Sequence, residues 1–308
     1  MTAVLIVVAL GFAWSMGAHY TGAVMGMPHA LGAIGAWRAL LLMAPLTFLG
    51  ATVASHAVER RVGYGLTSGA LSITEQVVVI GTAFAVTTAY NRLKVPTSTI
   101  QILVFAVVGT ALASGTGVHW PSILHLAVVW AAAPLAALVL GAAFTVGLDR
   151  LPLDHRIGAA LVAVGAVAAF AMGANDVSNA SGALVGTGTF SPLAAGAVGG
   201  VGLALGVLTW GKPLLRRVAF EIVEVDRAMA TAAQLVQAAV VLVAVAFGFF
   251  TSMNQALVAA MAGAGFARGR EAVHVETLVG IVYGWLLGPA GGFAIAYVGE
   301  RIAQAMTG

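Results

Sequence analysis

The stretch MGANDVSNA, residues 172–180, places one acid and two amides inside a chain that is otherwise strongly apolar. The nearest acid on its N-terminal side is Asp154. Ionisable residues are costly inside a bilayer, and those that are kept there mark functional sites. We therefore expect Asp176 and its neighbours to form a functional site within a membrane.

The composition of the whole chain indicates a membrane protein. Of its 308 residues 60% are hydrophobic and only 8% are charged, with a mean hydropathy of +1.00. A water-soluble domain of this size does not need so apolar a chain. The sequence therefore predicts a multi-pass protein of the cell membrane, with its first segment, Ala3–Met16, retained because it lacks a cleavage site.

Charge and cysteine content exclude several other classes of function. The net charge of +3 comes from loop arginines, which indicates orientation in the membrane and contact with anionic lipid, not nucleic-acid binding. The absence of cysteine excludes disulfides, thiol catalysis and cysteine metal sites. The 39 glycines suit close helix contacts and interrupted helices in a bilayer.

Apolar segments recur along the whole length, and we expect helices for all of them. An open strand cannot satisfy its backbone in lipid, and the alternating pattern of a barrel is absent. The predicted fold is therefore all-α, with two series of five segments separated by a polar break near residues 149–156. The segments are 3–34, 37–57, 71–90, 97–114 and 121–148, then 157–190, 193–211, 229–250, 252–266 and 277–298.

The two series match each other in order, which predicts a duplication into repeats 1–150 and 151–308. The matched elements are separated by 154 to 156 positions. They are Met16–Ala18 with Met172–Ala174, Arg60–Arg61 with Arg216–Arg217, Thr97–Gln101 with Thr251–Gln255, Gly109 with Gly263, and Trp130 and Pro134 with Trp285 and Pro289. Duplicated halves of transporters are often inverted, with the substrate site at their interface near the midplane. Inversion requires an odd number of crossings per half, and five segments satisfy it unless 97–114 is re-entrant.

In each half a Gly-Ala step precedes polar residues inside an apolar segment. The first half has Gly17 followed by His19, Tyr20 and Thr21. The second has Gly173 followed by Asn175, Asp176, Ser178 and Asn179. Glycine permits a local break, and exposed backbone groups are tolerated in a membrane only where they line a cavity or a protein-buried site. We expect both breaks to line the site.

A second matched pair of elements predicts two helices that start inside the membrane. Pro96–Thr99 in one half and Thr251–Ser252 in the other precede helical runs, and proline, serine and threonine are helix-start residues. Two such starts would aim free N–H groups and the positive ends of two helix dipoles at one point. We expect them to bind a small oxyanion.

These residues resemble a known family. The stretch Gly173–Ala180 is nearly the Gly-Ala-Asn-Asp-Val-Ala-Asn-Ala signature of the inorganic phosphate transporter (PiT) family, and Pro96–Thr99 matches its Pro-x-Ser-Thr-Thr element. Residues 251–255 look like a degenerate second copy. The resemblance covers essentially the whole chain and implies an inverted-repeat secondary transporter with paired hairpins. It carries anion and coupling-cation roles over to Asn175, Asp176 and Asn179, and implies a homodimer.

One departure from the signature favours a particular substrate. Phosphate-type members carry the Asn-Asp motif in both halves, whereas Tyr20 stands here where the first Asp is expected. The pattern is most similar to the sulfate permease (CysP-type) branch. Phosphate near neutral pH keeps an O–H that wants an acceptor, while sulfate has only acceptors and is best met by donors. We therefore favour sulfate over phosphate.

The predicted function is import of a small inorganic oxyanion by cation-coupled alternating access, not enzyme catalysis. The coupling ion is H⁺ or Na⁺, and Asp176 serves either one. No other cofactor or metal is expected. The candidate substrate-binding or coupling residues are Gly17, His19, Thr21, Thr97, Ser98, Thr99, Gln101, Gly173, Asn175, Asp176, Ser178, Asn179, Thr251, Ser252, Asn254 and Gln255.

The same residues also have structural interpretations, and two other classes of function were considered. Asp176 could bridge helices, His19 could be a packing residue near the site, and residues 97–99 and 251–252 could cap helices at the membrane surface. An intramembrane hydrolase using Ser114 or Ser181 lacks a nucleophile motif, and one acid does not make an aspartic dyad. A structural scaffold would not explain a polar constellation present in both halves.

Overall fold

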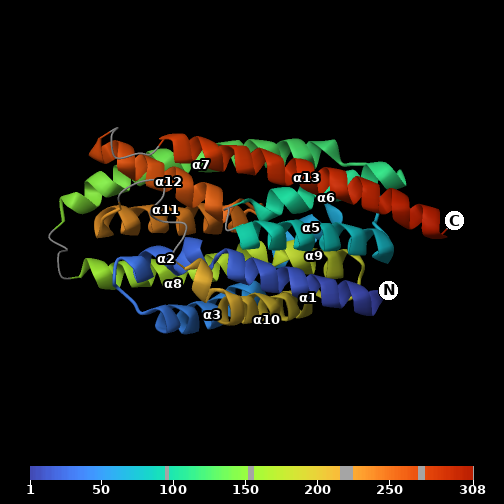
Figure 1. The fold of residues 1–308 in the computed structure, drawn as a ribbon, viewed down its shortest axis with the longest axis horizontal. Helices are drawn as coiled ribbons and strands as arrows, with labels where there is room; N and C mark the ends of the chain where they lie inside the picture. Colours follow the sequence, from blue (N-terminus) through green and yellow to red (C-terminus); the bar gives the residue numbers. More distant parts are fainter. Residues whose placement is uncertain (94–96, 152–155, 216–224, 270–274, 308) are drawn as a thin grey trace.

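The computed structural model describes residues 1–93, 97–151, 156–215, 225–269 and 275–307, and these residues are almost entirely helical (Figure 1). Across these ranges the only β-type pairing is an isolated bridge between Thr67 and Val118. Pro96, Asp154, Arg216 and Arg217, which entered the sequence argument, lie outside the described residues. The elements are α1 (Thr2–His19), α2 (Thr21–Ala30), α3 (Ala36–Val53), α4 (His56–Tyr64), α5 (Ile73–Leu93), α6 (Thr99–Ser114), α7 (Trp120–Asp149), α8 (Ile157–Asp176), α9 (Ser178–Gly186), α10 (Pro192–Trp210), the 3₁₀ turn η1 (Lys212–Leu214), α11 (Arg227–Ala246), α12 (Met253–Arg268) and α13 (Val275–Thr307).

Eight helices or helix pairs among the described residues are long and apolar enough to cross a membrane. Their outer surface is apolar: Leu135 on α7 and Leu286 on α13 are 66% and 65% exposed. Side chains of this kind suit contact with lipid, where exposure of an apolar group has no hydration cost. The all-α, multi-pass class predicted from the composition is confirmed.

The helix after α3 was not predicted. The apolar segment expected over 37–57 ends at Val53, and the chain bends before starting the short α4. His56, Glu59 and Arg60 make α4 too polar to read as a continuation of an apolar run. It lies outside the eight candidate spans.

The two expected helix breaks are smaller than an unwound turn. The α1–α2 pair is interrupted only at Tyr20, and the α8–α9 pair only at Val177, and both residues have right-handed helical dihedrals. Hydrogen bonds continue across each point, from Tyr20 N–H to the Met16 carbonyl at 3.0 Å and from Ser181 N–H to the Val177 carbonyl at 2.9 Å. The breaks therefore fall three or four residues after the glycines that were expected to cause them.

Two helical hairpins enter from opposite ends of the molecule (Figure 1). The α5–α6 pair lies toward the end that carries both termini, and the α11–α12 pair lies toward the other end. α6 and α12 have 16 residues each, which gives a rise of about 24 Å, less than the roughly 30 Å of a bilayer core. The structure therefore agrees with the re-entrant interpretation of residues 97–114, and α12 has the same character. This arrangement suits an inverted duplication, which remains a prediction, as does the division at residue 150.

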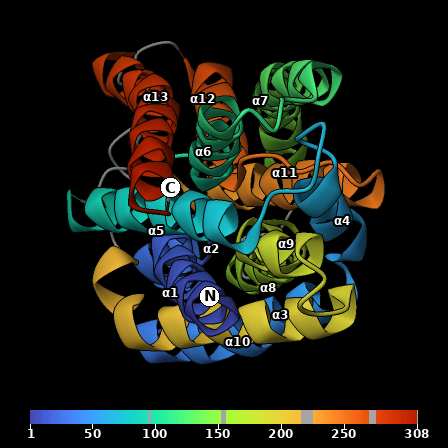
Figure 2. The same ribbon diagram turned by 90° about the vertical axis from the view of Figure 1, so that its right-hand side faces the viewer.

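Helix neighbours recur in matched pairs. α1 packs on α10 and α5, as α8 packs on α3 and α11; α6 packs on α13 as α12 packs on α7. Seen end-on, α1 and the α8–α9 pair lie side by side, with α10 and α3 below them and the hairpins above (Figure 2). The two interrupted helices thus lie next to the hairpins.

Glycine makes these contacts close. A Cβ atom on Gly17 would lie 2.0 Å from the Leu203 carbonyl oxygen, and one on Gly173 would lie 1.9 Å from the Thr47 carbonyl oxygen. Both glycines therefore serve helix packing, which corrects the expectation that they open a break beside the ligand. Small residues let membrane helices approach to backbone contact.

We expect Gly263→Ala to destabilise the protein, because its Cβ would lie 1.9 Å from the Leu138 carbonyl oxygen between α12 and α7. Overpacking of this kind costs about 1–3 kcal/mol. The measurement is the melting temperature in detergent. Gly280→Ala on α13 is the control, since nothing lies within 4 Å of its Cβ position. Equal melting temperatures for the two variants would show that α7 moves aside freely.

Candidate functional site

The starts of α6 and α12 are buried and capped in the same way. Ser98 and Ser252 are 0% exposed, and their hydroxyl oxygens accept hydrogen bonds from Gln101 N–H (3.4 Å) and Gln255 N–H (3.3 Å). Each cap satisfies one of the backbone donors that a helix start leaves without a partner. Both serines therefore cap helices, as the alternative interpretation expected, and both caps are buried inside the protein.

The two helix starts meet through their third residues. Gln101 donates to the Gln255 side-chain oxygen at 3.4 Å, and Gln255 donates to the Gln101 side-chain oxygen at 3.1 Å. This reciprocal amide pair joins the two hairpins directly. The positive ends of two helix dipoles therefore face each other across a short distance, and this arrangement favours an anion between them.

Asn175 fixes the hairpin of the second half to the interrupted helix. Its side chain donates to the Thr251 carbonyl at 2.9 Å and accepts from Thr251 N–H at 3.1 Å. Both backbone groups of Thr251 are thereby satisfied just before α12 begins. A non-helical residue inside a membrane protein needs such a partner.

Tyr20 and Asn179 meet on the other hairpin. The Tyr20 hydroxyl lies 2.7 Å from the Thr99 hydroxyl, and the Asn179 amide donates to the same Thr99 oxygen at 3.2 Å. All three side chains are buried. The predicted residues of the two halves are thus brought together at the start of α6.

His19 is held on both ring nitrogens. Nδ1 contacts the Asn91 side-chain oxygen; since the Asn91 amide donates to Ser15, Nδ1 carries the proton. Nε2 lies 3.1 Å from the Asn254 amide, which also donates to the Thr97 carbonyl at 2.8 Å. His19 is therefore engaged with protein groups in this conformation, in line with the packing interpretation.

Asp176 is fully buried next to these groups. Neither of its carboxylate oxygens has a hydrogen-bond partner within the described ranges, although Tyr20 and Asn175 are polar neighbours. The side-chain oxygens of Asn179 and Asn254 also lack a described partner. Buried oxygens of this kind are acceptors that suit a cation, a proton or water.

Two predicted residues lie beside the site, and their hydroxyls donate hydrogen bonds to backbone carbonyls. Thr21 donates to the Gly17 carbonyl at 2.9 Å and packs near Gly211, and Ser178 donates to the Asn175 carbonyl at 2.7 Å. Both hydroxyls stabilise the helix interruptions. They support the site and do not face the hairpin starts in this conformation.

Sequence reasoning left some site residues out of its candidate set. Tyr20 was named in the first break but was not among the candidate binding residues, yet its hydroxyl contacts Thr99. Asn91 gave no motif signal at all, because it lies at the inner end of an otherwise ordinary apolar helix. Gln237 of α11 was also left out, and its side chain donates to the Met253 carbonyl at 3.3 Å and so supports the α12 start.

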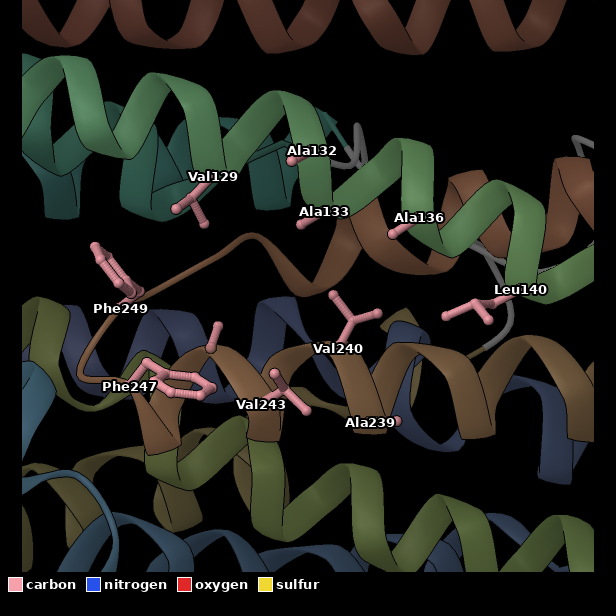
Figure 3. A pocket seen from close by; sticks show the side chains of 11 residues that line it. Val129, Ala132, Ala133, Ala136, Leu140, Ala239, Val240, Val243, Phe247 and Phe249 are labelled. Atoms are coloured by element: carbon pink, nitrogen blue, oxygen red, sulfur yellow. The ribbon is translucent and has the colours of Figure 1, made fainter.

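A cavity of about 550 Å³ lies between α7 and α11 and is separate from this site (Figure 3). Its walls are alanine, valine, leucine and phenylalanine side chains, with Phe247 and Phe249 at one end. A cavity without donors cannot replace the hydration of an anion. It is therefore not the anion site.

The hydroxyls considered for a hydrolase are occupied elsewhere. Ser181 contacts Glu59 and the Val177 carbonyl, and Ser114 contacts Thr116. Neither has a histidine partner within the described part of the chain. Nothing in these contacts supports a nucleophile.

Comparison with known proteins agrees with this geometry. The chain is 26% identical to the sulfate permease CysP of Bacillus subtilis, over 95% of this chain and 85% of that one. It is 27% identical to a probable low-affinity inorganic phosphate transporter of Mycobacterium leprae, over 98% and 82%. A solved structure described as the sodium-dependent phosphate transporter has the same fold, with a TM-score of 0.90 at 20% identity, covering 99% of this chain and 100% of that one.

The sequence model of the phosphate transporter family (PHO4) matches the chain twice, over residues 16–161 and 153–296. The matched relatives are transporters and not enzymes. With the paired hairpin starts and the Asn-Asp motif between them, the match shows that this chain, a multi-pass membrane protein, belongs to the phosphate transporter family.

Proposed function

We propose that the chain imports sulfate by cation-coupled alternating access, with the anion held between the starts of α6 and α12. The observation that carries the proposal is the Gln101–Gln255 pair, which brings two buried and capped helix starts together beside Asp176. Each helix start contributes up to about 2 kcal/mol to binding an anion in a partly buried setting.

The coupling cation would bind at Asp176, next to the two helix starts. Asp176 and the neighbouring amide oxygens are buried acceptors without described partners. A cation bound there neutralises the carboxylate and removes the repulsion between it and a dianion. The name of the solved structural relative, a sodium-dependent phosphate transporter, supports coupling to a cation in general.

The choice of sulfate rests on Tyr20. At this position a phosphate-type member would have a second carboxylate, which accepts the remaining proton of phosphate. Tyr20 instead has a phenolic hydroxyl that is already bonded to Thr99. The similarity to a sulfate permease supports this choice, and the names of the other relatives favour phosphate as the second candidate.

Asp176→Asn should abolish accumulation of labelled sulfate against a gradient while the protein still folds. The change keeps the size of a fully buried side chain and removes its charge. The measurement is the accumulation of labelled sulfate in liposomes that contain the purified protein. Asp226→Asn is the control, because Asp226 lies at the exposed end of the molecule in an ion pair with Arg268. Normal accumulation by Asp176→Asn would make Asp176 a structural residue.

Ser98→Ala and Ser252→Ala should each weaken the apparent affinity for the anion. Each loses a helix cap of about 1 kcal/mol, or roughly fivefold in binding. The double variant should lose more, because both helix starts face one ligand. Ser191→Ala is the matched control, since Ser191 caps α10 in an exposed position. An unchanged affinity in the double variant would separate the hairpins from the anion.

Selectivity provides the test between sulfate and phosphate. We expect excess thiosulfate to displace labelled sulfate and phosphate to compete poorly at neutral pH. Tyr20→Asp should lower sulfate transport, because it places a negative charge beside a dianion where water is excluded. Tyr20→Phe, which removes only the hydroxyl bonded to Thr99, serves as the control. Phosphate that competes as well as unlabelled sulfate would identify a phosphate transporter.

A further inference from the structure

A second acid is buried outside the anion site. Glu59, on α4, is 0% exposed, and no described cation forms an ion pair with it. α4 packs mainly on α9 and α10. An isolated buried charge is strongly unfavourable, so this carboxyl needs either several donors or a proton of its own.

Three helices close on this carboxyl at backbone distance. A Cβ atom on Gly196 of α10 would lie 3.2 Å from Glu59 Oε1, and one on Gly63 of α4 would lie 2.7 Å from the Gly182 carbonyl oxygen of α9. The two glycines let the helices approach until the carboxyl is enclosed. In this conformation the Glu59 side chain has no surface exposed to water.

The number of hydrogen-bond donors around Glu59 indicates whether its carboxyl is ionised or neutral. The Ser181 hydroxyl has one hydrogen but lies 2.6 Å from Glu59 Oε1 and 2.9 Å from the Val177 carbonyl. The hydroxyl of Ser55 donates to the Ala51 carbonyl at 2.6 Å, and Glu59 Oε2 has no described partner. An ionised carboxylate would have at most two donors, the hydroxyls of Ser181 and Ser55, and each hydroxyl would have to give up its bond to a backbone carbonyl. A neutral carboxyl donates to Ser181 Oγ, whose own hydrogen then bonds Val177, and no charge is left unpaired.

The electrostatic surroundings agree with a neutral carboxyl. Burial raises the pKa of Glu59 to about 7, against the smaller opposing effect of the hydroxyls of Ser181 and Ser55. α9 and α10 carry no acidic or basic residue. The titratable and charged groups on α4 itself and on the other helices near it are His56, Arg60, Arg61 and Tyr64 of α4, Arg38 near the start of α3 and Arg227 at the start of α11. Within the described residues none of these groups bonds to Glu59.

Glu59 is connected to the transport site through α9. Ser181 lies on the helix that begins directly after Asp176 and Val177, and the same helix carries Asn179, which donates to Thr99. A shift of α9 that opens the anion site therefore also breaks the contact between Ser181 and Glu59. Proton release and site opening then involve the same helix.

We propose that Glu59 is a proton-binding site that couples transport to the pH gradient. In the closed conformation its carboxyl keeps the proton; when α4 and α9 part, the O–H bond breaks, the proton passes to water and the carboxylate becomes solvated. The inference rests on the proposed transport function and adds a coupled proton at Glu59 to the cation that is proposed to bind at Asp176.

Reconstituted protein tests the proposal, with the membrane potential clamped at zero. Glu59→Gln should keep sulfate exchange across the membrane, since the amide replaces the neutral carboxyl. It should lose accumulation driven by a one-unit pH gradient, which supports up to about tenfold accumulation per coupled proton. Glu75→Gln, the same change at a partly exposed acid, should keep accumulation. Accumulation by Glu59→Gln equal to the parent's, or failure of this variant to fold, would overturn the proposal.

A second readout does not depend on transport. A carboxyl whose folded-state pKa is raised from 4.5 to about 7 binds more protons when folded, so its contribution to stability falls as pH rises through this window. The melting temperature of Glu59→Gln minus that of the parent should therefore rise between pH 5 and pH 8. A pH-independent difference would show that Glu59 is ionised in the folded protein.

The two hypotheses fail in different ways. A parent protein that exchanges neither sulfate nor phosphate contradicts the proposed function, while the melting experiment still decides whether Glu59 holds a proton. A parent that exchanges sulfate but accumulates it only on a Na⁺ gradient leaves the function intact and overturns the role of Glu59.

Discussion

The structure depends on one constraint: a backbone that leaves a helix inside a membrane must find its hydrogen-bond partners within the protein. Both hairpins break their helices in the interior, at Thr97–Ser98 and Thr251–Ser252. The partners come from the interrupted helices and the opposite hairpin. Asn175 satisfies Thr251, Asn254 satisfies Thr97, and two serines cap the helix starts. The residues that complete the fold are therefore the residues that surround the proposed anion.

The two predicted repeats have matched helix neighbours but differ in chemistry at the site. In the predicted duplication His19 corresponds to Asn175 and Tyr20 to Asp176. His19, Tyr20 and Asn175 contact the hairpin of their own half, whereas neither oxygen of Asp176 has a described hydrogen-bond partner. In the second half the Asn175 amide bonds the backbone of Thr251. In the first half His19 and Tyr20 both contact the hairpin, at Thr97 and Thr99. This asymmetry leaves a single carboxylate beside two positive helix ends, and it is the basis on which we propose sulfate as the substrate.

Buried charge is placed where helices meet and can separate. Asp176 lies between the interrupted helices and the hairpins, and Glu59 lies where α4, α9 and α10 touch through glycines. The exposed ion pairs are of a different kind: Arg268 bridges Asp149 and Asp226 at one end of the bundle, joining the ends of α7, α11 and α12. Exposed pairs contribute little to stability, whereas an enclosed carboxyl makes helix separation sensitive to its protonation.

The sequence alone determined the class of the protein, its ten apolar segments and most of its central residues. Composition decides that the chain lies in lipid, and the motif at 173–180 with the serines at 98 and 252 stands out because polar residues there are costly. Only the tertiary structure decided the use of each group. It assigned Gly17 and Gly173 to helix contacts, engaged both nitrogens of His19, and brought Asn91 and Tyr20 to the site. Residues such as Glu59 and Ser181 lie far apart in sequence, and their contact depends on how α4, α9 and α10 pack, which no local pattern encodes.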